Sequence, residues 1–270
     1  MRNKILPLLF FFVAILIVPK ASAQGDLMVM PKRLVFDGSQ RSQEINLANT
    51  GQDTAVYAIS FINYKMTDDG NFEQIETPEE GQRFATDFLR YFPRRVTLPP
   101  NEAQTIRVQL TRTGNLEQGE YRSHIYFRAV EKQTALGEDD ESPSEGIAIQ
   151  IKTIFGISIP VIIRHGEKIS NVSLSEIELD LKDSIPHLSM KINRSGNMSV
   201  YGDLLIEHIS PNGTKIKIGV IKGISVYTPN SYRHFSMKLD DTDGINLKEG
   251  KLKITYSSND VDLTVNEHNL

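Results

Sequence analysis

Residues that could act as catalysts or metal ligands are present in this chain, but they are scattered. The six histidines stand at positions 124, 165, 187, 208, 234 and 268, and none has the H-x-H or H-E-x-x-H spacing of a metal motif. Residues 240–244 are rich in carboxylates, but no glutamate follows at the offset of a calcium loop, which favours a turn. A G-x-S-x-G elbow, a phosphate-binding loop and a dinucleotide fingerprint are also missing. We therefore expect no enzymatic activity, no metal and no cofactor.

The first 23 residues predict a cleaved export signal. Arg2 and Lys4 provide positive charge, residues 5–18 form an apolar stretch, and residues 21–23 read Ala-Ser-Ala, a small-x-small cleavage site. The apolar stretch is short for a membrane-spanning helix, so we expect no stable membrane insertion; a retained anchor is the alternative. The chain contains no cysteine. Lipoprotein anchoring, thiol catalysis and disulfides are thereby excluded, and core burial alone must hold the exported protein together.

Removal of the signal leaves 247 of the 270 residues, enough for two domains. It also leaves 27 basic residues against 34 acidic ones, a net charge of −7. A charge of this sign does not favour nucleic acid as a partner.

Short runs of alternating apolar and polar residues fill most of the mature chain. Such runs, separated by turn residues, predict an all-β fold of antiparallel sandwiches. Only residues 84–92 suggest a helical turn, because Phe84, Phe88 and Tyr91 have helical spacing. The polar, glycine-containing stretch at 164–168 suits a linker. We accordingly expect domains at 24–165 and 166–270.

The longest alternating run covers residues 147–163 and follows an acidic loop at 131–146. At about 3.3 Å per residue it would span roughly 55 Å, which exceeds an ordinary strand, and Pro160 is expected to mark a break in it. The run can be read as an ordinary buried strand that leads into the second domain. It can also be read as an edge strand that offers Ile147, Ile149 and Ile151 to a partner lacking a strand. A loose loop just before the strand favours the second reading.

The chain resembles the periplasmic pilus-assembly (fimbrial) chaperones, a PapD-like family of immunoglobulin-like sandwiches. Together the segments that carry the resemblance cover most of the mature chain: residues 32–39 with Asn49, residues 92–100 with 104–108, residues 121–127 with the acidic loop and the isoleucines, and residues 193–197 and 250–256. The resemblance implies two immunoglobulin-like domains in an L-shaped arrangement and a periplasmic location. Implied partners are pilus or fimbrial subunits and an outer-membrane usher.

The resemblance also implies a mechanism: the chaperone donates one of its strands to a pilus subunit that lacks a strand. Ile147, Ile149 and Ile151 would fill the subunit's groove as the donated strand. Arg33 would hold the subunit's C-terminal carboxylate, although an interdomain or surface salt bridge is the alternative for this residue. The family's second basic residue falls at Gly156 in this alignment. Lys152 lies four residues earlier and could replace it only if the register differs.

Two other classes of protein compete with this reading. An exported immunoglobulin-like adhesion or scaffold protein would use the same architecture with its long strand fully paired. A hydrolase would need a catalytic pair that the sequence does not offer. Pairing of the free protein with a second copy through its exposed strand is left open.

Overall fold

The structure is a computed structural model that describes residues 27–130, 154–182, 185–239, 242, 244–258 and 261–270. The expected all-β fold is confirmed, since the described residues form strands and two short 3₁₀ turns. The first half contains β1 (Leu27–Met30), β2 (Leu34–Phe36), β3 (Ser42–Asn49), β4 (Ala55–Ile62), β5 (Tyr64–Met66), β6 (Phe72–Gln74), η1 (Thr86–Phe88), β7 (Leu89–Phe92), β8 (Arg95–Leu98), β9 (Ala103–Leu110), η2 (Thr113–Asn115), β10 (Gly119–Val130) and β11 (Gly156–His165). The second half contains β12 (Ser170–Asp180), β13 (His187–Gly196), β14 (Val200–Ile209), β15 (Lys215–Val226), β16 (Tyr232–Lys238), β17 (Lys251–Ser258) and β18 (Val261–Asn269).

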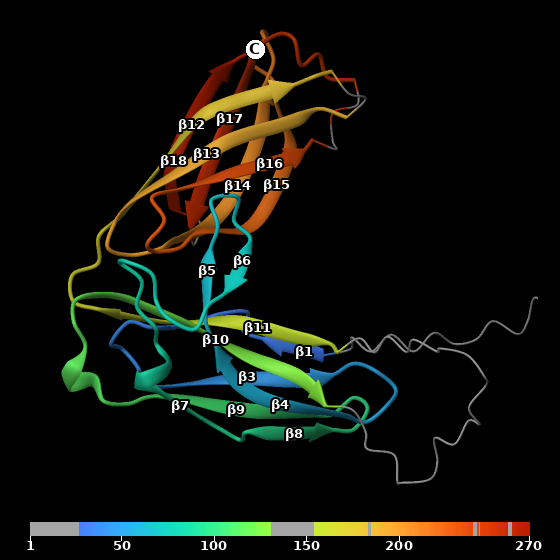
Figure 1. Cartoon of the computed structure of the whole chain (residues 1–270). Coiled ribbons are helices and arrows are strands. Elements are labelled where there is room, and N and C mark those ends of the chain that lie inside the picture. The colour runs from blue at the N-terminus through green and yellow to red at the C-terminus, as the bar shows by residue number, and fades with distance from the viewer. Residues whose placement is uncertain (1–26, 131–153, 183–184, 240–241, 243, 259–260) are drawn as a thin grey trace, which may run out of the picture.

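The first half is a sandwich of two sheets, in the orders β1-β3-β9-β7 and β2-β11-β10-β4-β8. In immunoglobulin lettering these are A-B-E-D on one sheet and G-F-C on the other, so the topology is immunoglobulin-like. The first strand changes sheets: β1 pairs with β3, and β2 then runs parallel to the last strand, β11. Figure 1 shows this sandwich lying across the lower part of the molecule.

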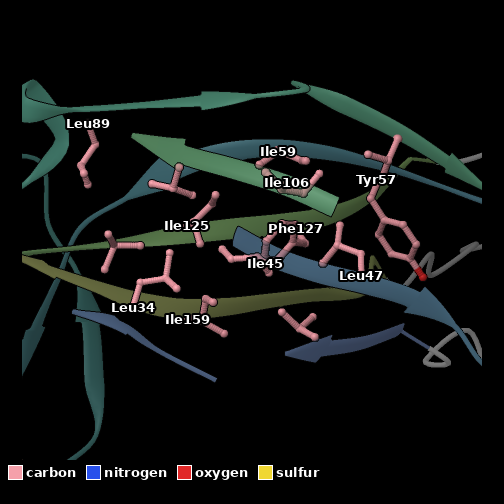
Figure 2. Close-up of a cluster of buried hydrophobic side chains, with 14 of the residues drawn as sticks. Leu34, Ile45, Leu47, Tyr57, Ile59, Leu89, Ile106, Ile125, Phe127 and Ile159 are labelled. Atoms are coloured by element: carbon pink, nitrogen blue, oxygen red, sulfur yellow. The ribbon is translucent and has the colours of Figure 1, made fainter. Parts of the chain in front are cut away.

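Side chains from the two sheets meet in one apolar core. Ile45 and Ile106 come from one sheet and Ile125 and Phe127 from the other, and none of the four has accessible surface. Figure 2 shows these side chains pointing toward one another between the layers. Burying each one stabilises the fold by about 1.5–3 kcal/mol, which accounts for a domain that stands without disulfides.

The second half forms another sandwich, with sheets in the orders β12-β13-β16 and β15-β14-β17-β18. These orders correspond to A-B-E and to C′-C-F-G, again an immunoglobulin-like arrangement. Its core is separate from the first and includes Leu188, Ile192, Leu204, Ile254 and Tyr256. In Figure 1 this sandwich rises above the first one, and residues between β11 and β12 connect the two.

The expected helical turn at residues 84–92 is wrong over most of its length. Only η1 is helical, and it is followed at once by β7, which pairs with β9. Leu89 is buried and Arg90 is exposed, so the alternation of a strand decides the structure here. The i, i+4, i+7 spacing of the aromatic residues is a coincidence of composition.

The expected break at Pro160 is also wrong. β11 runs without interruption from Gly156 to His165, and Pro160 lies opposite His124 within the ladder to β10. Pro160 precedes the residues that pair with β2, and on that side no strand among the described residues pairs with it, which is the position in a sheet where proline is tolerated. Within the described part of the chain, no helix has the length and hydropathy that a membrane crossing requires.

Candidate functional site

The open edge of β11 is the first element of the candidate site. One side of β11 pairs with β10 along its whole length. On the other side β2 accompanies it only at Val161, Ile162 and Ile163. From Gly156 to Pro160 no strand among the described residues lies on that side. Such an edge presents backbone N–H and C=O groups that an extended chain could pair with.

The side chains of β11 and of the residue before it alternate between the core and the outer face of the sheet. Ile159 and Val161 are buried in the core of the first sandwich, and Phe155 and Ile157 pack against it. Gly156 lies on the outer face, where a Cβ atom would come 2.3 Å from the Tyr126 hydroxyl. The family's second basic residue would fall at this position. In this chain Tyr126 fills the space that a side chain at residue 156 would need.

The proposed groove-filling residues and one proposed anchor lie outside the described residues. Ile147, Ile149, Ile151 and Lys152 all precede Ile154, where the description of this segment resumes. Their assignment to a donated strand stays a prediction. Arg33 is described and can be placed.

Arg33 lies just before β2 and faces the second sandwich. Its Cζ atom is 4.1 Å from the centre of the Tyr201 ring on β14, a cation–π contact between the two halves of the chain. The side chain is half-buried, and its Nε atom is buried without a hydrogen-bond partner. No carboxylate within the described ranges pairs with Arg33, so the salt bridge considered for it is not formed there. The guanidinium retains donors for an incoming anion.

A buried carboxylate, Glu120, joins the two sandwiches beside this site. Arg164 donates from Nε to the Glu120 carboxylate at 3.0 Å, and the side chain of Glu120 has no accessible surface. The Ser199 backbone N–H and hydroxyl both donate to the same carboxylate from the second sandwich. Arg164 also donates to the Ser199 carbonyl at 2.9 Å. A buried charge is tolerated only with such partners, so this network ties the start of β14 to β10 and β11.

Two further ionisable residues of β10 face the same interface. The Cζ atom of Arg122 lies 4.2 Å from the Tyr227 ring centre, and burial lowers the pKa of its guanidinium. The His124 ring meets Tyr64 and Phe72 edge-on, with centroids 4.9 and 5.6 Å away. Burial, and secondarily the charge of Arg122, lowers the pKa of His124 to about 3. His124 is therefore neutral near pH 7 and acts as an aromatic ring in the interface.

From the sequence we did not predict that Glu120, Arg122 or Arg164 would be interface residues. A signal was present, since residues 120, 122 and 124 place three ionisable side chains at alternate positions of a strand whose other face is apolar. Such a face normally points to water. Here the second sandwich covers Glu120 and Arg122, and β5 and β6 cover His124. Within the described ranges, no group of three or more histidine, aspartate or glutamate side chains could hold a metal ion.

The described fold and site define a two-domain immunoglobulin-like protein with an open strand edge and a buried charge network between its domains. No protein-family model and no curated protein sequence matches the chain. Among solved structures, it is similar to the YadV chaperone, at 12% identity and a TM-score of 0.45, over 91% of this chain and 100% of that one.

Two further solved structures give similar values. The CupB2 chaperone of Pseudomonas aeruginosa matches at 12% identity and a TM-score of 0.44, over 90% of this chain and 98% of its own. A structure of the Salmonella enterica SafA pilin in complex with the SafB chaperone matches at 11% identity and a TM-score of 0.43, over 93% of this chain and 99% of that one. At these identities and TM-scores the likeness is one of overall layout and decides neither activity nor partner.

Proposed function

We propose that this chain is a periplasmic chaperone that binds pilus or fimbrial subunits and caps them by donating an edge strand before fibre assembly. The observation that carries the proposal is the open edge of β11 over residues 156–160. The alternating isoleucines at 147, 149 and 151 lead directly into this edge. A subunit that lacks a strand would pair with the backbone of this segment and take up its alternate side chains.

Arg33, which lies where the two sandwiches meet, also supports the proposal. We assign it to the subunit's C-terminal carboxylate, because the half-buried guanidinium has no carboxylate neighbour among the described residues. A charge-assisted hydrogen bond of this kind contributes about 1.5–3 kcal/mol. Loss of Arg33 should therefore weaken subunit binding roughly ten- to a hundredfold. Lys152 is the candidate second cation.

The remaining assignments follow from the same proposal. The protein acts after export, with residues 1–23 as a cleaved signal, residues 24–165 as the subunit-binding domain and residues 166–270 as the smaller domain. An outer-membrane usher would receive the complex. The activity is one of binding, without a catalytic step.

The decisive experiment replaces the proposed donor residues. Ile149→Asp combined with Ile151→Asp should abolish co-purification of the subunit while the chain stays folded, because a carboxylate cannot enter an apolar groove unpaired. The matched control is Ile216→Asp with Val220→Asp on β15, where both side chains are 41% exposed. Subunit binding that survives the first double substitution contradicts the proposal.

Hydrogen exchange separates this function from an adhesion or scaffold role. A donor strand with an unpaired edge should exchange its amide hydrogens quickly in the free protein. Slow exchange over residues 147–151 in the free monomer would favour the fully paired strand of a scaffold. Measurement of the oligomeric state at the same concentration tells whether a second copy provides the protection.

A further inference from the structure

The hairpin of β5 and β6 stands apart from both sandwiches. Each of its strands has three residues, and it pairs with no other sheet. Figure 1 shows it projecting from the first sandwich toward the second. A two-stranded hairpin of this size is marginally stable in water by itself. Its conformation must therefore depend on what it docks against.

The turn of the hairpin docks against the start of β16 in the second sandwich. The His234 backbone N–H donates to the Asp68 carbonyl at 2.6 Å. The Tyr232 hydroxyl donates to the Asp68 carboxylate at 2.8 Å. The Arg233 guanidinium packs so closely on Gly70 that a Cβ atom there would come 2.0 Å from Arg233 Nε. Three consecutive residues of β16 thus contact this one turn.

The strand pair next to the turn, Met66 and Phe72, also contacts both halves of the chain. Met66 is buried in one cluster with Ile162 of β11 and Tyr227 of the second sandwich. The Asn230 side-chain amide donates to the Met66 carbonyl at 3.0 Å. Phe72 lies 6.0 Å from the Tyr227 ring, measured between centroids. The hairpin therefore makes apolar as well as polar contacts across the interface.

The hairpin contacts lie away from the segment that connects the two sandwiches, so they can limit bending at that segment. The Glu120 network includes Arg164, which lies near the end of β11 and close to the connection between the sandwiches. That network alone would leave a hinge beside the connection. Figure 1 shows the hairpin reaching the second sandwich away from the connection, so its contacts resist bending at that hinge.

We propose that the β5–β6 hairpin is an interdomain clasp, which holds the second sandwich at one angle to the first and so keeps Tyr201 against Arg33. The clasp consists of residues 64–74 on one side and residues 227–234 on the other. It concerns the free chain and goes beyond the chaperone function proposed above.

A pair of matched glycine substitutions tests the clasp. Gly70 and Gly213 both lie in hairpin turns with φ of +85°, so any side chain costs similar backbone strain at either site. A Cβ atom at Gly213 meets nothing within 4 Å, whereas at Gly70 it meets Arg233. Gly70→Lys should therefore displace the Arg233 guanidinium from the turn, add like charge beside it and loosen the hairpin on β16, while Gly213→Lys should leave the interface intact.

The readout is the distance between two spin labels, one in each sandwich. The chain has no cysteine, so Gln104→Cys and Lys217→Cys, both exposed, provide the only labelling sites. We expect one narrow distance distribution in the unsubstituted chain and in Gly70→Lys a broader one with a second component. The Gly213→Lys distribution should match the unsubstituted chain. An equally narrow distribution in Gly70→Lys overturns the clasp.

A second variant keeps the test decisive if Gly70→Lys disturbs folding. Asn230→Ala with Tyr232→Phe removes two bonds to the hairpin from the second sandwich and adds no strain. The same broadening is expected, and its absence again overturns the proposal. Because no subunit is present in this experiment, its outcome is independent of whether the chain proves to be a chaperone.

Discussion

The buried histidine of β10 yields a prediction about acid stability. In the unfolded chain the pKa of a histidine is about 6.5, and in the folded protein the pKa of His124 is about 3. Between these two values the unfolded chain binds a proton that the folded chain does not. The stability contributed by neutral His124 is therefore fully present above pH 6.5 and is lost as the pH falls toward 3.

The magnitude follows from the distance between pH 5 and the unfolded pKa. One pH unit corresponds to about 1.4 kcal/mol, so 1.5 units give a loss of about 2 kcal/mol between pH 8 and pH 5. His124→Phe should abolish this part of the loss, because a phenyl ring keeps the contacts with Tyr64 and Phe72 and does not titrate.

The assay is urea unfolding of the full chain at pH 8 and at pH 5, followed by near-ultraviolet circular dichroism. Carboxylates also titrate in this range, but they do so equally in both proteins, so the difference between them isolates His124. His165→Phe is the control, because His165 is exposed and its replacement should leave the pH dependence unchanged. If unsubstituted protein and His124→Phe lose the same stability between the two pH values, the reasoning from burial is wrong.

Three other substitutions have outcomes that follow from local contacts. Glu120→Ala should lower the free energy of unfolding in urea by about 3–5 kcal/mol, since it leaves Arg164 without its buried partner. Glu44→Ala, in an exposed pair with Arg107, should lower it by under about 1 kcal/mol. Similar costs for the two substitutions would argue against the buried network. Gly202→Ala should lower the free energy of unfolding by about 1–3 kcal/mol or more, because the new Cβ atom would come 2.2 Å from the Ser257 carbonyl oxygen. Gly114→Ala, where a Cβ atom meets open space, should change it by less than about 1 kcal/mol. Thermal unfolding compares the two variants. Tyr256→Phe should cost about 0.5–1.5 kcal/mol by removing the buried hydrogen bond to the Ile224 carbonyl, and an unchanged midpoint in the same assay would contradict that bond.

The sheets could be predicted because burial on one face leaves a period of two in the sequence. Ile106 and Val108 alternate with polar residues and are fully buried, as the pattern requires. The prediction of a helical turn was wrong because the apolar residues in 84–91 fit both the period of a helix and that of a strand. Pairing with β9, which lies later in the chain, decides between the periods, and a local pattern contains no information about that pairing.

The sequence could predict only those parts of the candidate site that lie within a single strand. The open edge of β11 could be suspected because one continuous alternating run in the sequence contains it. The contact of Arg33 with Tyr201 could not, because it depends on how two separately folded sandwiches meet. Glu120 was missed for the same reason: its partners, Arg164 and Ser199, lie 44 and 79 residues away in sequence.

The short pairing between β2 and β11 limits what the open edge can accept. β2 occupies the edge from Val161 onward, beside Leu34, so a strand added along Gly156–Pro160 would meet β2 and stop. The five described residues of this free edge measure about 16 Å. If a subunit strand is added there as proposed, β2 would limit how far it can slide and so which of its side chains face the core. Lengthening or shortening β2 would change the register of pairing without altering any residue of β11.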